Sequence, residues 1–306
     1  MDKNLTYWDP LGEKITPDTF RLQTQKLIDR AEQYKKNPAQ IGRNRMLCIG
    51  IGVAVMATYV SMWGFTGYWI HISFLGFLPL FIYLAIISAF QQNFILFLMC
   101  RQQEWIYNPD HDKERYNKLK EYYPDIFECG HSQQVEDQIW GSIAQQRIDF
   151  WNCAFTYTTG SGKSSRTQDH SVFIVKLSKK LPIECTLMRK GYLSFAKSKY
   201  KTESEEFNTL FYIKVHHEGP DTQMHLMNIL SPSVQVRLIQ MAKELPLDGI
   251  TFKENTLAID FEDELWKPKY TNFYKEVVVD KRDMDDFNAV IKKMTELPGE
   301  MIQFMD

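Results

Sequence analysis

A short string of glycine, lysine and serine is the part of this sequence that most resembles a chemical motif. Residues 159–165 read Thr-Gly-Ser-Gly-Lys-Ser-Ser, and Gly-Lys-Ser is how a phosphate-binding loop ends. Such a loop also needs a glycine five positions before Gly162, where Tyr157 stands, and a helix directly afterward. A polar run and then a strand around Phe173 follow instead. The composition predicts a hairpin turn, and nucleotide binding by the turn from Gly160 to Ser165 is the alternative.

Cysteine and histidine side chains form two short groupings that suggest metal ligands. Cys129 and His131 flank a glycine, but no second pair follows at the spacing of a tetrahedral zinc site, so a loop cysteine is expected. His216 and His217 are adjacent, and His225 follows them. Because neighbouring residues on a strand point to opposite faces, only one of the pair could join His225. We expect polar strand histidines there and assign no metal ligand.

Three other groups allow a chemical or a structural interpretation. Cys153 and Cys185 lie in strand-like runs with no histidine and carboxylate beside them, so small core residues are expected. The acidic residues at 260–264 and at 283–286 lack the spacing of a calcium loop and suit solvated strand ends and helix starts. Residues 266–270, Trp-Lys-Pro-Lys-Tyr, suit lipid headgroups, a protein partner or a connection between elements. No catalytic, cofactor-binding or metal-binding residue is therefore assigned.

The composition excludes one class of partner. The chain has 306 residues, with 36 Lys+Arg against 38 Asp+Glu and a formal net charge of -2. No basic field is available to collect nucleic acid, so no nucleic-acid partner is expected. The five cysteines are odd in number and scattered, which favours a reducing compartment over a disulfide framework. The polar N-terminus lacks the pattern of a cleavable signal peptide, so targeting is expected from an internal apolar segment.

That apolar segment contains no Lys, Arg, Asp or Glu between Arg45 and Arg101. A bilayer core takes about 20 apolar residues per helix, and the glycines and aromatic residues at 64–69 mark a turn. We therefore expect contact with a lipid bilayer through two spans, residues 46–63 and 72–90. The alternative is a buried helical hairpin of a soluble protein, which the length of the charge-free stretch disfavours.

Cations flank both ends of this stretch and are absent from its central turn. Because Lys and Arg resist translocation, we expect a multi-pass protein of the cell membrane with both termini in the cytoplasm. Small residues on one face of the first span would let another helix approach closely. That helix could be the second span of the same chain or a helix of another copy, and both explain the small residues equally well. These residues are Gly50, Ala54, Ala57 and Ser61.

The fold class predicted for the whole chain is α+β: a two-helix transmembrane hairpin plus a cytoplasmic domain with an antiparallel sheet and packed helices. The expected divisions are an N-terminal cytoplasmic segment with one amphipathic helix capped by Thr16 (1–44), the transmembrane hairpin (45–100), a helical stalk or lead-in (101–147) and the cytoplasmic α+β domain (148–306).

Within the last division, alternating apolar residues predict hairpins and the 3.6-residue period predicts helices. Strands are expected at 155–157, 172–175, 183–188, 192–195 and 207–215, with a hairpin over 250–261. Helices are expected at 223–230, from Pro232, and from about Asp280 until Pro298 stops the last one.

The order of these elements resembles an uncharacterised bacterial family in which two membrane spans precede a cytoplasmic domain of unknown function. The resemblance rests on a strand at 207–215, a short helix ending in Ile-Leu-Ser-Pro at 229–232, an amphipathic helix, and the strands around 250–252 and 257–259. It implies the same topology and fold. The family offers no activity and no catalytic residue to transfer to this chain.

The sequence contains no complete catalytic constellation, so it favours a membrane-anchored module that is not an enzyme and needs no cofactor. Such a module would bind another protein or assemble with copies of itself on the cytoplasmic face. One alternative is a nucleotide-responsive or enzymatic domain that uses the turn from Gly160 to Ser165. A second alternative is lipid handling at the inner leaflet, which would require an apolar cavity.

Overall fold

The computed structural model describes residues 6–36, 38–63, 78–128, 130–143, 148–160, 165–190, 198–263, 265 and 281–305. The chain divides into two compact units, one within Met1–Arg21, Cys100–Trp266 and Lys281–Asp306, and the other within Leu22–Met99 and Lys267–Asp280. In the part of the chain that is described, the first unit holds a β-sheet covered by helices, and the second holds long helices.

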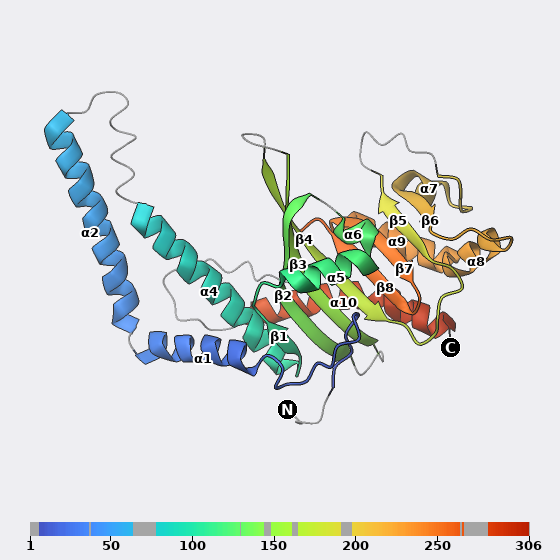
Figure 1. Ribbon diagram of the computed structural model, residues 1–306, viewed down its shortest axis with the longest axis horizontal. Helices are drawn as coiled ribbons and strands as arrows, with labels where there is room; N and C mark the ends of the chain where they lie inside the picture. Colours follow the sequence, from blue (N-terminus) through green and yellow to red (C-terminus); the bar gives the residue numbers. More distant parts are fainter. Residues whose placement is uncertain are drawn as a thin grey trace. The chain divides into compact units, whose positions relative to one another are not determined.

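The sheet has eight strands, and every pairing between neighbours is antiparallel (Figure 1). The strand order is β1-β2-β3-β4-β8-β7-β5-β6. The strands are β1 (Ile106–Asn108), β2 (His131–Ile143), β3 (Ile148–Thr159), β4 (Arg166–Lys176), β5 (Cys185–Arg189), β6 (Phe211–Val215), β7 (Leu247–Lys253) and β8 (Thr256–Phe261). The turn between β7 and β8 places Glu254 at a φ of 49°, in the left-handed region.

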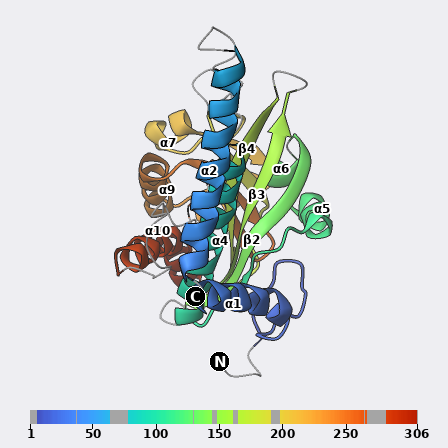
Figure 2. The same ribbon diagram turned by 90° about the vertical axis from the view of Figure 1, so that its left-hand side faces the viewer.

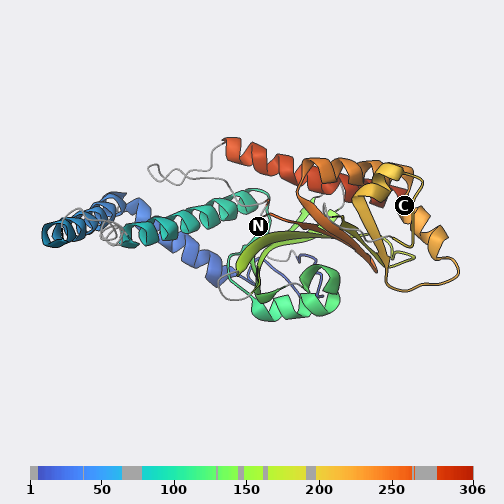
Figure 3. The ribbon, with the colours of Figure 1, turned by 90° about the horizontal axis from the view of Figure 1, so that it is seen from above.

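Helices cover both faces of this sheet (Figures 2 and 3). One face carries α5 (Lys113–Tyr122) and α6 (Pro124–Phe127), and the opposite face carries α7 (Glu205–Leu210), α9 (Pro232–Glu244) and α10 (Lys281–Met305). The short helix α8 (Thr222–Ile229) precedes α9. The side chain of Asp112 caps α5 by accepting a hydrogen bond from the backbone N–H of Arg115, at 2.8 Å.

The central strands bury side chains on both faces because each face is covered. On β3, Trp151, Cys153 and Phe155 belong to the core cluster that α5 and α6 close. Phe150, the residue before Trp151, contacts Phe173 and Trp105 on the other face, with ring centroids 5.1 and 4.8 Å away. A sheet buried on both faces loses the alternation of apolar and polar residues that marks a half-exposed strand.

The helices that extend into the second unit are α1 (Arg21–Lys36), α2 (Pro38–Trp63) and α4 (Leu78–Gln102). The guanidinium of Arg30 on α1 lies 5.1 Å from the ring centroid of Phe90 on α4, within the range of a cation–π contact. The predicted N-terminal helix thus exists, but it begins at Arg21. The Thr16 backbone N–H instead donates to the Thr19 hydroxyl in the preceding turn, at 2.9 Å.

Among the helices in the described ranges, none combines the length and the apolar character needed to cross a membrane. The transmembrane hairpin expected at residues 46–63 and 72–90 is therefore wrong, and so is the fold class built on it. The multi-pass location in the cell membrane with both termini in the cytoplasm is corrected with them. Residues 72–77 lie outside the described residues.

The physical reason for this correction lies in the composition and burial of the two helices. The first turns of α2 carry Arg43 and Arg45, and Gln91, Gln92 and Asn93 interrupt the apolar run of α4. Beyond that interruption, the apolar side chains have the protein itself as their surroundings. Ile95, Leu96, Met99 and Cys100 are all buried. The absence of ionic residues therefore reflects, for this part of α4, burial within the protein.

Three other elements depart from expectation. Residues 101–147, expected as a helical stalk or lead-in, contain α5, α6, β1 and β2 in their described part. The strand expected at 207–215 is a helix followed by the shorter strand β6, because Ser204 caps α7 by accepting from the backbone N–H of Phe207. Pro298 does not stop the last helix, since α10 continues through it to Met305.

Candidate functional site

The first candidate is an apolar surface in the second unit. Among the residues described, most large hydrophobic side chains that remain exposed lie on α2 and α4. We call them the apolar surface: Met46, Leu47, Ile51 and Val53 on α2, and Leu78, Phe81, Ile82 and Ile86 on α4. On α4 they recur every three or four residues and share one face. Exposed apolar patches of this kind mark interaction sites.

The small residues of α2 lie within this surface. Gly50, Ala54, Ala57 and Ser61 are all exposed, and a methyl group placed on Gly50 would meet nothing within 4 Å. Helical spacing places this stripe between the side of the helix that carries Met46 and the side that carries Ile51. Packing against α4 was one of the two explanations for these small residues. Because all four of these described residues are exposed, that packing is absent for them.

The polar atoms of the same face are already satisfied within the helix. The Thr58 hydroxyl donates to the backbone carbonyl of Ala54 at 2.8 Å, and the Ser61 hydroxyl donates to that of Thr58 at 2.8 Å. A partner that covered this face would therefore not leave these hydroxyls without a hydrogen bond.

The second candidate is a cluster of side chains on the α5–α6 face of the sheet, where β4, β7 and β8 run side by side. His170 Nδ1 lies 3.2 Å from Asp260 Oδ1, and His170 Nε2 lies 3.2 Å from the Tyr157 hydroxyl. His170 and Asp260 are both buried, and Asp248 is partly buried beside them. Burial raises the pKa of Asp260 to about 6, although the hydrogen bond and charge of His170 oppose the shift.

The pKa of His170 is raised as well. Burial alone would lower it, but the hydrogen bond that His170 donates to Asp260 and the charges of Asp260 and Asp248 outweigh that effect. The rings of Phe155 and Tyr157 lie 5.3 and 5.1 Å from the imidazole and hold it in place. The cluster is thus a fixed imidazole with the Asp260 carboxylate at its Nδ1 and a second carboxylate, that of Asp248, close by.

The third candidate is a carboxylate at the start of α6 that collects donors from β5 and β6. Asp125 accepts hydrogen bonds from Lys214 Nζ at 2.6 Å and from the Thr186 hydroxyl at 2.7 Å, and His216 Nε2 lies 3.0 Å away. Asp125 and His216 line a cavity of 180 Å³, together with Glu184 and Lys253. Burial raises the pKa of Asp125, but the hydrogen bonds and the neighbouring cations outweigh it, so the pKa is lowered.

This lowered pKa predicts how acid affects the protein. A carboxylate whose folded-state pKa lies below its unfolded value adds stability above the unfolded pKa, near 4, and loses that stability as the pH falls through the folded pKa. Wild-type protein should therefore lose stability below about pH 4 more steeply than Asp125→Asn or Lys214→Met. Urea denaturation at a series of pH values measures this, and equal slopes for all three proteins would contradict it.

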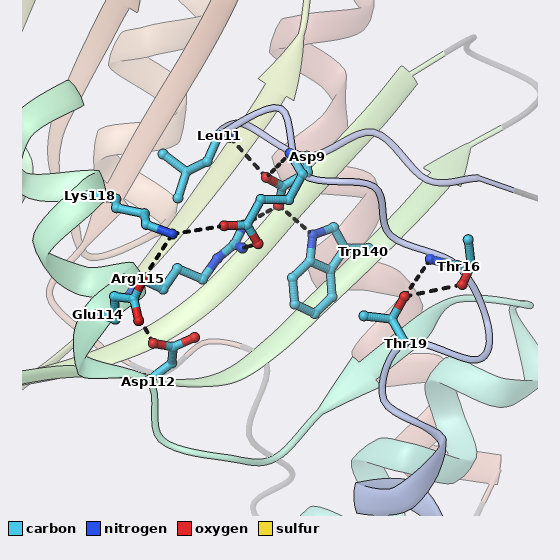
Figure 4. A network of polar contacts seen from close by, with 10 residues as sticks. Asp9, Leu11, Thr16, Thr19, Asp112, Glu114, Arg115, Lys118 and Trp140 are labelled. Carbon is cyan, nitrogen blue, oxygen red and sulfur yellow. Dashed lines mark hydrogen bonds and ion pairs between the residues drawn. The ribbon is translucent and has the colours of Figure 1, made fainter.

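A fourth polar network ties the N-terminal segment to the sheet (Figure 4). Asp9 accepts from Trp140 Nε1 at 2.9 Å and from the guanidinium of Arg115, and its other oxygen accepts from the backbone N–H groups of Leu11 and Glu13 at 2.9 and 3.2 Å. The Arg115 guanidinium also lies 5.2 Å from the ring of Trp140. Both charges are almost completely buried and every oxygen of Asp9 is satisfied, so this network is structural.

The motifs that the sequence suggested are mostly not brought together. Gly160 stands at the tip of the β3–β4 hairpin with a φ of 78°, and residues 161–164 lie outside the described residues. Cys129 and residues 266–270 also lie outside them, and His131 is exposed at the start of β2. On α10, Asp285 and Asp286 are exposed.

The histidine and cysteine predictions have a clearer outcome. His217 and His225 line one cavity of 410 Å³, and His216 does not line it. His216 instead contacts Asp125, so only one of the adjacent histidines 216 and 217 joins His225, as predicted. Cys153 and Cys185 are fully buried as expected, and burial raises the pKa of Cys185 to about 12, which keeps its thiol protonated. Glu184, Glu218 and Asp221 also line the cavity of 410 Å³, so its wall carries carboxylates beside apolar residues such as Leu181 and Ile183.

Sequence reasoning missed the cluster around His170. Asp260 was expected at a solvated strand end but is 4% exposed. The sequence did contain an indication of this cluster. His170 alternates with Val172 and Ile174 on β4, and Asp260 alternates with Ala258 on β8, so each polar residue stands on the buried face of its strand. Asp248 gave no such signal, since an irregularity in strand register brings it to the cluster.

The described residues define an α+β protein with an antiparallel sheet covered on both faces and a helical unit that exposes an apolar surface. No protein-family model and no functionally curated protein matches the chain. Among solved structures, the chain is similar to the mycobacterial trehalose monomycolate transport factor A, with a TM-score of 0.36 and 6% identity. That match covers 70% of this chain and 95% of the other. A TM-score of this size does not establish a shared fold.

Proposed function

We propose that this protein is an assembly module in which the apolar surface of one copy packs against that of a second copy. The observation that carries the proposal is the exposure of the large apolar side chains of α2 and α4, from 43% at Ile51 to 71% at Met46. Burying one such side chain contributes about 1.5–3 kcal/mol, so the exposed set is costly to leave in water.

A second copy is favoured over an unrelated partner because the exposed face of α2 complements itself. Gly50, Ala54 and Ala57 have small side chains, and helical spacing places Met46 and Ile51 on the two sides of this stripe, a pattern that favours a shallow groove along the helix. Related by a two-fold axis, the groove of each helix would receive a ridge of the other. The chain carries no ionic side chain between Arg45 and Arg101, so like charges do not oppose the approach of two copies.

Two substitutions of the same kind test this proposal. Val53 lies in the apolar surface and is 54% exposed, and Val236 on α9 lies outside it and is 62% exposed. In cells that express two differently tagged copies, purification of one should recover the other. Val53→Glu on both copies should reduce that recovery at least tenfold, because a buried unpaired carboxylate opposes association.

Val236→Glu is the matched control and should leave the recovery unchanged. Because both valines are exposed, neither substitution is expected to disturb the folded chain, which circular dichroism checks. Equal recovery with Val53→Glu and Val236→Glu would contradict the proposal. Failure of the wild-type copies to recover one another would also contradict it.

A further inference from the structure

The geometry around His170 points to a binding site for one divalent transition-metal ion, such as Zn²⁺ or Mn²⁺, held by His170, Asp248 and Asp260. Each of these three residues offers a ligand atom, and these atoms all lie within 4.8 Å of one another. The inference is independent of the assembly proposed for α2, since it rests on residues of β4 and of the β7–β8 hairpin.

The spacing of the donor atoms suits coordination. Two ligand atoms that each lie about 2.1 Å from one ion are separated by about 3.0–3.4 Å in octahedral or tetrahedral geometry. His170 Nδ1 and Asp260 Oδ1 are 3.2 Å apart, and they already have the separation of two ligands on one ion. Only the Asp248 carboxylate, which is partly exposed, has to move toward the other two.

A break in the β7–β8 register aims Asp248 at the site. Leu247 pairs with Phe261 and Gly249 pairs with Asp260, so Asp248 is an extra residue in β7 with no partner in β8. Such bulges re-aim one side chain and are frequent beside functional sites. In a regular strand, Asp248 would point to the face opposite that of its neighbour Gly249, which pairs with Asp260.

The second nitrogen of His170 is held as it is in metal sites. Histidines that bind a metal through one ring nitrogen usually donate the other N–H to an oxygen, which fixes the tautomer and the ring orientation. His170 Nε2 lies 3.2 Å from the Tyr157 hydroxyl, and Nδ1 faces the carboxylates. Tyr157 would therefore act as a positioning residue.

The donor set selects the class of ion. One imidazole and two carboxylates favour borderline ions such as Zn²⁺ and Mn²⁺ over Ca²⁺, which prefers six or more oxygen ligands. Two carboxylates also balance the charge of a divalent ion. This balance is needed because the site is buried, with the side chains of His170 and Asp260 each 6% exposed, and an unbalanced buried charge is costly. The partly exposed Asp248 gives the ion a path from solvent.

The test is metal binding by the tag-free full-length protein after treatment with a chelator. Isothermal titration with ZnCl₂ and with MnCl₂ should show binding at one ion per chain for at least one of them. Asp248→Asn should weaken that binding at least a hundredfold, and Tyr157→Phe should weaken it by a smaller factor of about ten. Asp169→Asn is the matched control, because Asp169 neighbours His170 on β4 but is exposed.

Asp260→Asn and His170→Gln alter buried groups, so circular dichroism checks that these variants fold. If either variant fails to fold, Asp248→Asn still decides the test, because Asp248 is only partly buried. Substitution with Co²⁺ gives a second readout, since its visible bands should be lost in Asp248→Asn and kept in Asp169→Asn. The inference would be overturned if neither Zn²⁺ nor Mn²⁺ bound at one ion per chain. Binding that Asp248→Asn leaves unchanged would also overturn it, because the ion would then sit elsewhere.

Discussion

Replacing Asp9 by alanine is expected to lower the free energy of unfolding by about 3–5 kcal/mol. The Asp9 and Arg115 side chains are 0% and 4% exposed, so the substitution leaves a buried guanidinium without its main counter-ion. It also removes the acceptor for Trp140 Nε1. Glu13 still faces Arg115 Nη1 at 3.0 Å, but its side chain is 43% exposed and replaces only part of the lost interaction.

Denaturant unfolding followed by tryptophan fluorescence measures this effect, because Trp140 and Trp151 both lie against Arg115. The control is Asp18→Ala, which removes an exposed carboxylate 3.8 Å from Arg21 and should cost less than about 1 kcal/mol. The double variant Asp9→Ala/Arg115→Met should be more stable than Asp9→Ala, because it removes the unpaired charge. A loss below about 1 kcal/mol for Asp9→Ala would show that the pair is not the anchor of the N-terminal segment.

Gly141 is the second position at which a small change should have a large effect. A Cβ atom there would lie 2.5 Å from Cζ of Phe150 and 2.8 Å from Cδ1 of Trp105, which is closer than real contacts allow. Phe150 cannot move away freely, because its ring packs against both Trp105 and Phe173. Gly141→Ala should therefore lower the free energy of unfolding by about 2–3 kcal/mol.

Gly219→Ala is the matched control for this substitution, since a Cβ atom on Gly219 would meet nothing within 4 Å. Its stability should stay within about 1 kcal/mol of the wild type. The same denaturation assay measures both variants. Equal stability of Gly141→Ala and Gly219→Ala would mean that the aromatic cluster on this face of the sheet can rearrange at little cost.

The elements with strong local signals were predictable. The hairpin expected over 250–261 is formed by β7 and β8, with the polar turn where the sequence placed it. The helices expected at 223–230 and from Pro232 are α8 and α9. Turn residues and helical periodicity act over a few residues, so they can be recognised without the rest of the chain.

The elements that depend on distant contacts were not predictable. Strand β2 contains Gln133, Gln134 and Asp137, which have low strand propensity, and pairing with β1 and β3 on either side makes it a strand. The α7 cap at Ser204 did leave a local signal, because Glu205 and Glu206 follow it in the first turn. The Asp9–Arg115 pair joins residues 106 positions apart, so no local pattern could indicate it.

The interpretation of the charge-free stretch failed for a different physical reason. A lack of ionic residues indicates an apolar environment, but it does not distinguish lipid from protein. The end of α4 is buried within the protein, whereas the large apolar side chains of α2 and of the start of α4 are exposed, and we propose that a second copy of the chain covers them. The candidate site at His170 was missed because β4, β7 and β8 bring together three residues that the sequence separates.

Sedimentation velocity of the tag-free full-length protein, over a range of micromolar concentrations, tests self-assembly most directly. We expect the wild type to have the mass of two or more copies and to approach the mass of one copy on dilution. Val53→Glu should have the mass of one copy at every concentration. A parallel sample contains phosphatidylcholine and phosphatidylglycerol vesicles. A single-copy mass for the wild type throughout, or wild-type protein that associates with the vesicles in place of another copy, would contradict it.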